Sequence, residues 1–164
     1  MTNVRTLALV AGLLLALPAL GWEVGEFRNG MTRAEVDEAL KSWNFDQRLL
    51  VGSDSVYVYD GPDNPAGRRF LFTFCNDKLV SFSQEIEPTF AHFVVVASNY
   101  SHLYGHPLEV VPQASVIASG QTSQLAMFWR RGPDYVGLRY AELPASEKLS
   151  MTWQVSNNCW QAPR

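Results

Sequence analysis

Several short segments of this chain place apolar side chains at every second position, the spacing of a β-strand with one buried face. The last is the clearest, because Leu149, Met151, Trp153 and Val155 alternate with polar residues. In the segment 69–75, phenylalanine occupies every second position from 70 to 74. The alternation, together with turn-forming residues between segments, predicts further strands over 55–59, 79–86, 109–118, 123–130 and 135–141. The chain is therefore predicted to be rich in antiparallel sheet.

Two other segments have the period of a helix. Thr32 and Glu35 are spaced as a capping box, in which each side chain satisfies a free backbone amide of the first turn. The apolar stripe that follows consists of Val36, Ala39, Leu40 and Trp43. A second helix is predicted to begin after Thr89 and to end at Gly105. The β-branched run 94–96 also suits a strand, but the apolar period over four turns favours a helix.

The order of these elements is one helix and three strands, followed by a second helix and three or four strands. This order predicts an α+β fold of two α-β-β-β units, with the helices packed on one face of antiparallel sheet. We expect the first half to span residues 22–87 and the second residues 88–164, within one compact domain. The pattern leaves open whether the halves form one sheet or two.

Residues 1–21 have the layout of a cleavable signal peptide. A basic amino end with Arg5 precedes an apolar run over 7–20, and small residues stand before Trp22. The run of about 14 residues is shorter than the roughly 20 needed to cross a bilayer. We therefore expect cleavage before Trp22 and a periplasmic or secreted mature protein with no membrane span.

The charge balance excludes two classes of partner. The chain has 13 basic and 16 acidic residues, a net charge of −3, and loss of Arg5 with the signal peptide makes it slightly more acidic. Such a balance offers no basic surface for nucleic acid or anionic lipid. Aromatic residues make up 12% of the chain and charged residues only 18%, which indicates a folded rather than a disordered protein.

Cys75 and Cys159 are the only cysteines. An even count in an exported protein favours a disulfide. Closing so long a loop contributes on the order of 4 kcal/mol in the chain-entropy model. A reactive thiol and a metal pair are the alternatives, but neither a Cys-x-x-Cys spacing nor a flanking histidine supports them. The predicted bond would join a strand end in the first half to the segment after the last strand.

Two short stretches resemble known envelope proteins. Residues 30–36, Gly-Met-Thr-Arg-Ala-Glu-Val, resemble the helix start of the SmpA/OmlA family of small bacterial envelope proteins. Residues 104–107 resemble the helix-ending Gly-x-Pro of the same kind of unit, which also builds the tandem fold of the β-lactamase inhibitor protein. SmpA/OmlA proteins are lipoproteins, and this chain lacks their lipid-bearing cysteine. The resemblance implies an α+β fold and a domain that binds other proteins without catalysing a reaction.

Aromatic and arginine side chains gather on strands of the second half that are expected to be neighbours. Both alternating faces of the segment 125–129 are apolar, which exceeds the need of a sheet with one buried face. Packing against a second layer would make these aromatics part of the core. The alternative is a concave aromatic surface flanked by arginines, of the kind that anchors protein interfaces. The candidate binding residues are Trp129, Arg130, Arg131, Tyr135, Arg139, Tyr140 and Trp153.

A metal site has weaker support. His102 and His106 have the i, i+4 spacing of two imidazoles that share a metal on a helix. His92 and Glu109 are the candidate additional ligands. Gly105 lies between the two histidines, and a residue before proline avoids helical geometry, so His106 is expected to point elsewhere. No metal or other cofactor is therefore predicted.

Calcium binding and hydrolysis are two further chemistries for which the sequence offers candidate residues. The loop residues Asp60, Asp63 and Asn64 offer oxygen ligands for calcium, although turn formation explains them equally well. No Gly-x-Ser-x-Gly elbow is present. A hydrolase would need the fold to assemble a site from the serines 53, 55 and 119 or from the carboxylates of Glu85, Glu87 and Glu142. No catalytic residue is predicted.

The sequence thus predicts a soluble, exported, non-catalytic domain that binds an envelope or secreted protein. It would act in envelope assembly or as an inhibitor of a secreted enzyme. The alternative is a periplasmic protein that binds a small ligand or a metal in a pocket between helix and sheet.

Overall fold

The computed structural model describes residues 21–61 and 67–160. The predicted signal peptide, apart from Gly21, lies outside the described residues. The strands are β1 (Glu23–Val24), β2 (Phe27–Arg28), β3 (Gln47–Val51), β4 (Ser55–Tyr59), β5 (Arg69–Cys75), β6 (Lys78–Ile86), β7 (Glu109–Ile117), β8 (Gly120–Arg131), β9 (Asp134–Leu143) and β10 (Ser146–Val155). The helices are α1 (Arg33–Leu40), before β3, and α2 (Phe90–Tyr104), between β6 and β7.

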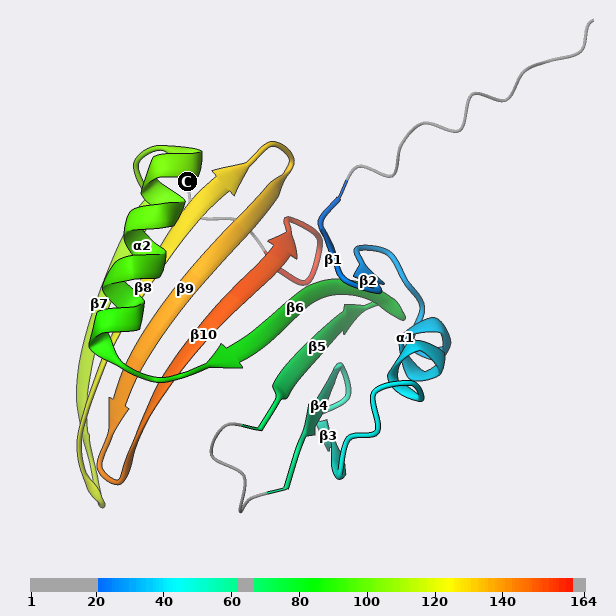
Figure 1. The fold of residues 1–164 in the computed structure, drawn as a ribbon, viewed down its shortest axis with the longest axis horizontal. Helices are drawn as coiled ribbons and strands as arrows, with labels where there is room; N and C mark the ends of the chain where they lie inside the picture. Colours follow the sequence, from blue (N-terminus) through cyan, green and yellow to red (C-terminus); the bar gives the residue numbers. More distant parts are fainter. Residues whose placement is uncertain (1–20, 62–66, 161–164) are drawn as a thin grey trace, which may run out of the picture.

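Strands β3 to β10 form one antiparallel sheet, in the order β3-β4-β5-β6-β10-β9-β8-β7 (Figure 1). The pairing of β6 with β10 joins the strands that follow α1 to those that follow α2. At the centre of this pairing Phe82 lies opposite Trp153, and their rings stack with centroids 5.7 Å apart. The chain therefore has an α+β fold with a single large sheet.

Most predicted strands are found close to their predicted bounds, but their number differs. Four strands follow α1, where three were predicted, and four follow α2. The strand after α1 that was not predicted is β3, at one edge of the large sheet, and the two short strands β1 and β2 before α1 were not predicted either. All five of its residues are exposed, so its sequence, Gln-Arg-Leu-Leu-Val, carries no alternation between a buried and a wet face.

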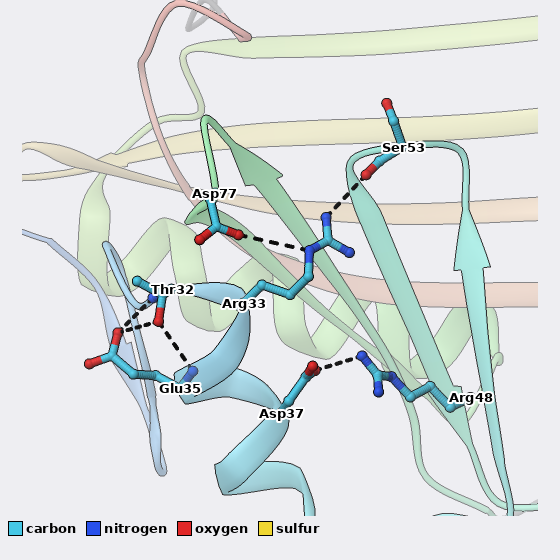
Figure 2. A network of polar contacts seen from close by, with 7 residues as sticks. All are labelled: Thr32, Arg33, Glu35, Asp37, Arg48, Ser53 and Asp77. Atoms are coloured by element: carbon cyan, nitrogen blue, oxygen red, sulfur yellow. Dashed lines mark hydrogen bonds and ion pairs between the residues drawn. The ribbon is translucent and has the colours of Figure 1, made fainter.

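The predicted capping box of α1 is confirmed. The hydroxyl of Thr32 accepts a hydrogen bond from the amide of Glu35 (3.2 Å), and the Glu35 carboxylate accepts one from the Thr32 amide (2.7 Å) (Figure 2). The helix ends at Leu40. Trp43, the last member of the predicted stripe, therefore lies beyond the helix, although it still packs against the buried residues beneath it.

Charged side chains fix where α1 lies on the sheet. The guanidinium of Arg33 donates to the carbonyl of Ser53 in the β3–β4 turn (3.1 Å) and lies 4.0 Å from Asp77 in the β5–β6 turn. Arg48 of β3 reaches Asp37 of α1 at 2.6 Å (Figure 2). Exposed pairs of this kind contribute at most about 1 kcal/mol each. Their role is therefore mainly to orient α1 toward two turns of the sheet.

The helix prediction for residues 90–104 is also confirmed. Thr89 caps α2 by accepting a hydrogen bond from the amide of His92 (3.1 Å). The helix ends at Gly105, whose φ of 86° is one that glycine adopts without strain. Figure 1 shows α2 lying along β8 and β9. In the described part of the chain, no helix is long and apolar enough to span a membrane.

Both helices cover the same face of the sheet. Buried residues of α1 pack with the phenylalanines of β5 and β6, including Phe72 and Phe82. Phe93 of α2 belongs to a second cluster with Trp129 of β8 and Leu149 of β10. Trp153 packs against both clusters, so they lie on one side of the sheet.

The predicted disulfide is present. Cys75, at the end of β5, is bonded to Cys159, with Cα atoms 5.9 Å apart across a sequence separation of 84. The bond ties the segment after β10 to the end of a strand that follows α1. It therefore connects the two parts of the chain at a point outside the helix-covered core.

Candidate functional site

The face of the sheet opposite the helices is here called the open face. Directly opposite residues of an antiparallel pair share a face, so the pairing identifies the side chains on it. One row across the open face consists of Tyr57, Leu71, Ser83, Thr152, Gly137 and Phe128. A second row consists of Tyr59, Arg69, Glu85, Ser150, Arg139 and Ala126. A third consists of Thr73, Ser81, Gln154, Tyr135 and Arg130.

The structure divides the candidate binding residues between the two faces. Trp129 is completely buried and Tyr140 is 7% exposed, both on the face that α2 covers. Trp153 lies on the same face, half-buried between the two core clusters. These three aromatics therefore pack in or against the core and do not form the exposed surface that was one interpretation of the sequence.

The remaining candidates separate by the two-residue period of the strands. Tyr135 and Arg130 lie opposite each other on the open face, and Arg139 lies on the same face further along β9. Arg131, one residue after Arg130, is exposed on the helix side. The open face thus brings together three of the seven predicted residues, and only one of them is aromatic.

Two adjoining cavities lie on the open face. The larger, of about 670 Å³, lies at the margin of the open face where β6 leads toward α2, and the helix-side residues Ile86 and Leu149 line it together with open-face residues. The second, of about 410 Å³, lies over the middle of the sheet. Its floor is made largely of small polar side chains from Thr73, Ser81, Ser83, Ser150, Thr152 and Gln154. Tyr57, Arg69 and Glu85 line both cavities, which we therefore treat as one groove.

Glu85 is the most heavily contacted acid of the groove. Its carboxylate accepts a hydrogen bond from the hydroxyl of Tyr57 (3.2 Å) and lies 3.7 Å from Lys148 and 4.0 Å from Arg69. Burial, and then the negative charge of Glu85, raises the pKa of Tyr57 to about 12. Two cations and a hydroxyl therefore surround the Glu85 carboxylate, and its oxygens are already engaged by side chains of the protein.

The segment after β10 forms one wall of the groove. The Asn157 side-chain oxygen accepts hydrogen bonds from the amides of Cys159 (2.7 Å) and Trp160 (3.0 Å), which turns the chain back over the sheet. The Trp160 ring then packs edge-on against Tyr135, with centroids 5.6 Å apart. Gln154 beneath is only 8% exposed. Trp160 was not among the residues predicted from the sequence, where its only signal is its position next to a disulfide cysteine.

Of the carboxylates named as candidates for hydrolysis, Glu85 and Glu87 line the larger cavity, and Glu142 does not. Glu85 faces the groove. Glu142 points to the helix side, because its neighbour Ala141 lies opposite Lys148 on the open face and successive residues of a strand point to opposite faces. Glu87 lies 3.5 Å from His92 at the start of α2. Ser55 donates a hydrogen bond to Thr73, and the carbonyl of Ser53 accepts one from Arg33.

The candidate metal ligands also stay apart. His102 lies in the last turn of α2 and His106 beyond its end, and both are exposed. His92, near the other end of α2, is within 3.3 Å of the backbone carbonyl of Glu87. Among the described residues, no three His, Cys, Asp or Glu side chains gather where they could hold a metal ion.

The loop proposed for calcium is described only in part. Asp63 and Asn64 lie outside the described residues. Asp60 receives two hydrogen bonds from the Arg68 guanidinium, at 2.9 and 3.0 Å. These bonds hold the pKa of Asp60 below its usual range. The carboxylate of Asp60 is therefore already engaged by a cation of the same loop.

Comparison of this chain with protein-family models, curated proteins and solved structures finds no match in any of the three. The class of protein is therefore stated from the geometry. It is an α+β domain with one antiparallel sheet, two helices on one face and a polar, aromatic-walled groove on the other.

Proposed function

We propose that this protein is a non-catalytic binding domain that recognises a segment of another protein on its open face. The observation that carries the proposal is the groove itself, which runs over β5, β6 and β10 on the face that neither helix covers. Tyrosine, tryptophan and arginine are enriched in protein interfaces. All three are present here, as Tyr57, Arg139 and Trp160.

The groove suits binding better than catalysis. Its floor offers hydroxyl and amide groups that can exchange hydrogen bonds with a peptide backbone, and two of them, Ser83 and Thr152, already bond each other at 2.7 Å. Its main acid, Glu85, is engaged by Tyr57, Lys148 and Arg69. Such a surface offers hydrogen bonds and shape to a bound peptide.

Export is part of the proposal. The predicted signal peptide and the disulfide both support a periplasmic or secreted location. Trp22 is 1% exposed and stacks on Phe82, so cleavage must leave Trp22 in the mature chain for the core to stay complete. Amino-terminal sequencing of the exported protein should therefore read from Trp22 or an earlier residue. A first residue beyond Trp22 would contradict this site.

The proposed role is that of an envelope assembly factor or an inhibitor of a secreted enzyme. The resemblance of residues 30–36 and 104–107 to SmpA/OmlA proteins and to the β-lactamase inhibitor protein supports this role, as does the paired helix-and-strand order. The partner would be an envelope or secreted protein.

Photocrosslinking in the producing cells tests the proposal. A photoreactive phenylalanine replaces Tyr59 or Tyr135 on the open face, and Ser98 on the exposed side of α2 serves as the control position. We expect both open-face positions to give a crosslink to the same discrete protein, and the control to give none. Crosslinks formed only from the α2 position would contradict the proposal.

One observation favours a small ligand as a second candidate. The larger cavity, about 670 Å³, is within the range of small-molecule sites. Native mass spectrometry of the protein purified from its own cells tests this. A bound compound that is lost in Lys148→Ala but kept in Lys41→Ala, at the exposed end of α1, would support the second candidate. Protein of unmodified mass would count against it.

A further inference from the structure

We infer that the segment bound in the groove is acidic, and that Arg139 binds one of its carboxylates. This inference rests on the proposed function and adds the chemistry of the partner. The structure supports it in three ways: the distribution of charge between the faces, the engagement of the other cations, and the surroundings of Arg139.

Charge is distributed unevenly over the molecule. The whole chain carries a net charge of −3. The basic side chains that the pairing places on the open face are Arg69, Lys78, Arg130, Arg139 and Lys148, and the acidic ones are Glu85 and Glu109. The sheet surface of the open face is therefore net positive on an acidic protein, while the acids Glu87 and Glu147 add negative charge only at the larger-cavity end of the groove. Complementary charge steers the encounter with a partner and fixes its orientation, which favours an acidic segment here.

Three of the other open-face cations already have partners inside the protein, and the fourth, Lys78, does not line either cavity of the groove. Arg69 and Lys148 both lie within ion-pair distance of Glu85. The guanidinium of Arg130 donates to the carbonyl of Gly132 at 3.1 Å. Arg139 is exposed and has no hydrogen bond or ion pair with any other described residue. Its planar fork of N–H donors is thus available to bind a carboxylate with two parallel hydrogen bonds.

The neighbours of Arg139 keep it accessible from the groove. The residues directly opposite it are small: Ser150 on β10 and Ala126 on β8. Arg139 lines the cavity over the middle of the sheet and a smaller one of about 110 Å³ beside it, and Trp160 lines both as well. An ion pair formed beside such a ring is partly shielded from water and is stronger than one on a flat surface.

Gly137 determines the shape of the sheet surface beside Arg139. A Cβ atom on Gly137 would lie 3.3 Å from the Phe128 ring, so the ring rests against the bare backbone of β9. Phe128, Trp160 and Arg139 all line the smaller cavity, and Phe128 and Trp160 are its aromatic residues. At the other end of the groove, Glu87 and Glu147 line the larger cavity. A carboxylate is therefore favoured beside Arg139 and disfavoured at that end.

Selection from a library of random displayed peptides tests the inference, with the mature protein as bait. Arg139→Gln removes the proposed contact, and Arg131→Gln removes the same charge from the helix side. We expect the unmodified protein to select peptides enriched in aspartate and glutamate. A synthetic copy of one such peptide should bind Arg139→Gln about 10- to 100-fold more weakly, the effect of losing a charged hydrogen-bond pair. Binding to Arg131→Gln should change less than about twofold.

The outcomes separate this inference from the proposed function. Peptides without acidic enrichment that depend on Tyr57 and Trp160, by alanine substitution, would overturn the inference and leave the groove as a binding site. Acidic peptides that bind Arg139→Gln and Arg131→Gln equally well would also overturn it. Failure to select any peptide, or selection of peptides that ignore every groove substitution, would count against both. Thermal unfolding of each variant shows that a loss of binding is not a loss of fold.

Discussion

The side chains on one face of strands β8, β9 and β10 fill the core, and those on the other face line cavities. On the helix side, Trp129, Val136 and Leu149 are fully buried and close the core beneath α2. On the open side, Phe128, Arg139 and Thr152 line cavities. Neighbouring residues of one strand, such as Phe128 and Trp129, therefore belong to different parts of the molecule.

Residue type alone does not determine whether a side chain belongs to the core or to the groove. A tryptophan at position 129 is part of the core, whereas one at position 160 forms the wall of a groove. What separates them is the layer that lies above each ring. Trp129 lies beneath α2 and meets Tyr100 edge-on at 5.4 Å, and Trp160 rests on the sheet from the outside. Substitutions matched in type but placed on different faces should therefore have unequal effects.

The largest expected difference is between Trp129→Ala and Trp160→Ala. Removing a fully buried tryptophan leaves a cavity under α2, and we expect a loss of about 3–5 kcal/mol in the free energy of unfolding. The half-buried Trp160 should cost about 1 kcal/mol, because its outer side already contacts water. Denaturant-induced unfolding followed by circular dichroism measures both. Equal losses would show that the two faces are not energetically distinct.

The sequence predicted the alternation of the strands but not which face would be covered. In the segment 125–129 both sets of alternating residues are apolar, so period alone could not tell Phe128 from Trp129. The deciding contact is with α2, which lies more than twenty residues earlier in the chain. Such a tertiary contact leaves no mark on the local pattern of the strand.

The two elements that bound the open face were harder to predict. Strand β3 is exposed along its whole length, so it has no buried face to impose a period. Trp160 owes its place to the Asn157 turn and to the disulfide of Cys159. The cysteine pair was predicted from count and context, but its consequence for the groove depends on how the segment folds back. The capping box of Thr32, by contrast, is a local motif, and it was found as predicted.

The disulfide offers the next largest effect. Replacing both Cys75 and Cys159 by serine should lower the free energy of unfolding by about 2–4 kcal/mol, because the unfolded chain regains the entropy of an open loop. The local consequence should fall on the open face. We expect faster amide hydrogen exchange in residues 155–160 and little change in α2 below the unfolding temperature. Uniformly faster exchange would mean that the bond supports both faces alike.

A smaller effect is expected on the helix side, at Asp134. Its carboxylate is 4% exposed, and one oxygen has no hydrogen-bond partner among the described residues. Burial raises the pKa of Asp134, opposed in part by the charge of Arg131. An acid whose pKa is higher in the folded chain holds its proton more tightly there. Its contribution to stability is therefore present at low pH and is lost as pH rises through the folded-state pKa.

Asp134→Asn should accordingly raise the free energy of unfolding at neutral pH, by about 1 kcal/mol or less. It should also remove the part of the stability that declines as pH rises from acid to neutral. Exposed Glu109 provides the control for the loss of one negative charge, and Glu109→Gln should change the free energy of unfolding at neutral pH by less than about 0.5 kcal/mol. A parallel profile for Asp134→Asn and the unmodified protein would show that the Asp134 carboxylate is solvated after all.

The finest distinction between the faces concerns two tyrosines with similar pKa values and different surroundings. Burial comes first in raising the pKa of Tyr57, on the open face, to about 12, and Glu85 adds to it. Burial also raises the pKa of Tyr100, on α2, to about 12, and there the added charge is that of Tyr104. Glu85→Gln should therefore lower the pKa of Tyr57 part of the way toward its ordinary value and leave Tyr100 unchanged, and Tyr104→Phe should do the reverse. Ring-carbon NMR titration at alkaline pH resolves each residue. If Glu85→Gln lowered the pKa of both tyrosines, the effect of the substitution would extend through the sheet to Tyr100. The two faces would then be electrostatically coupled.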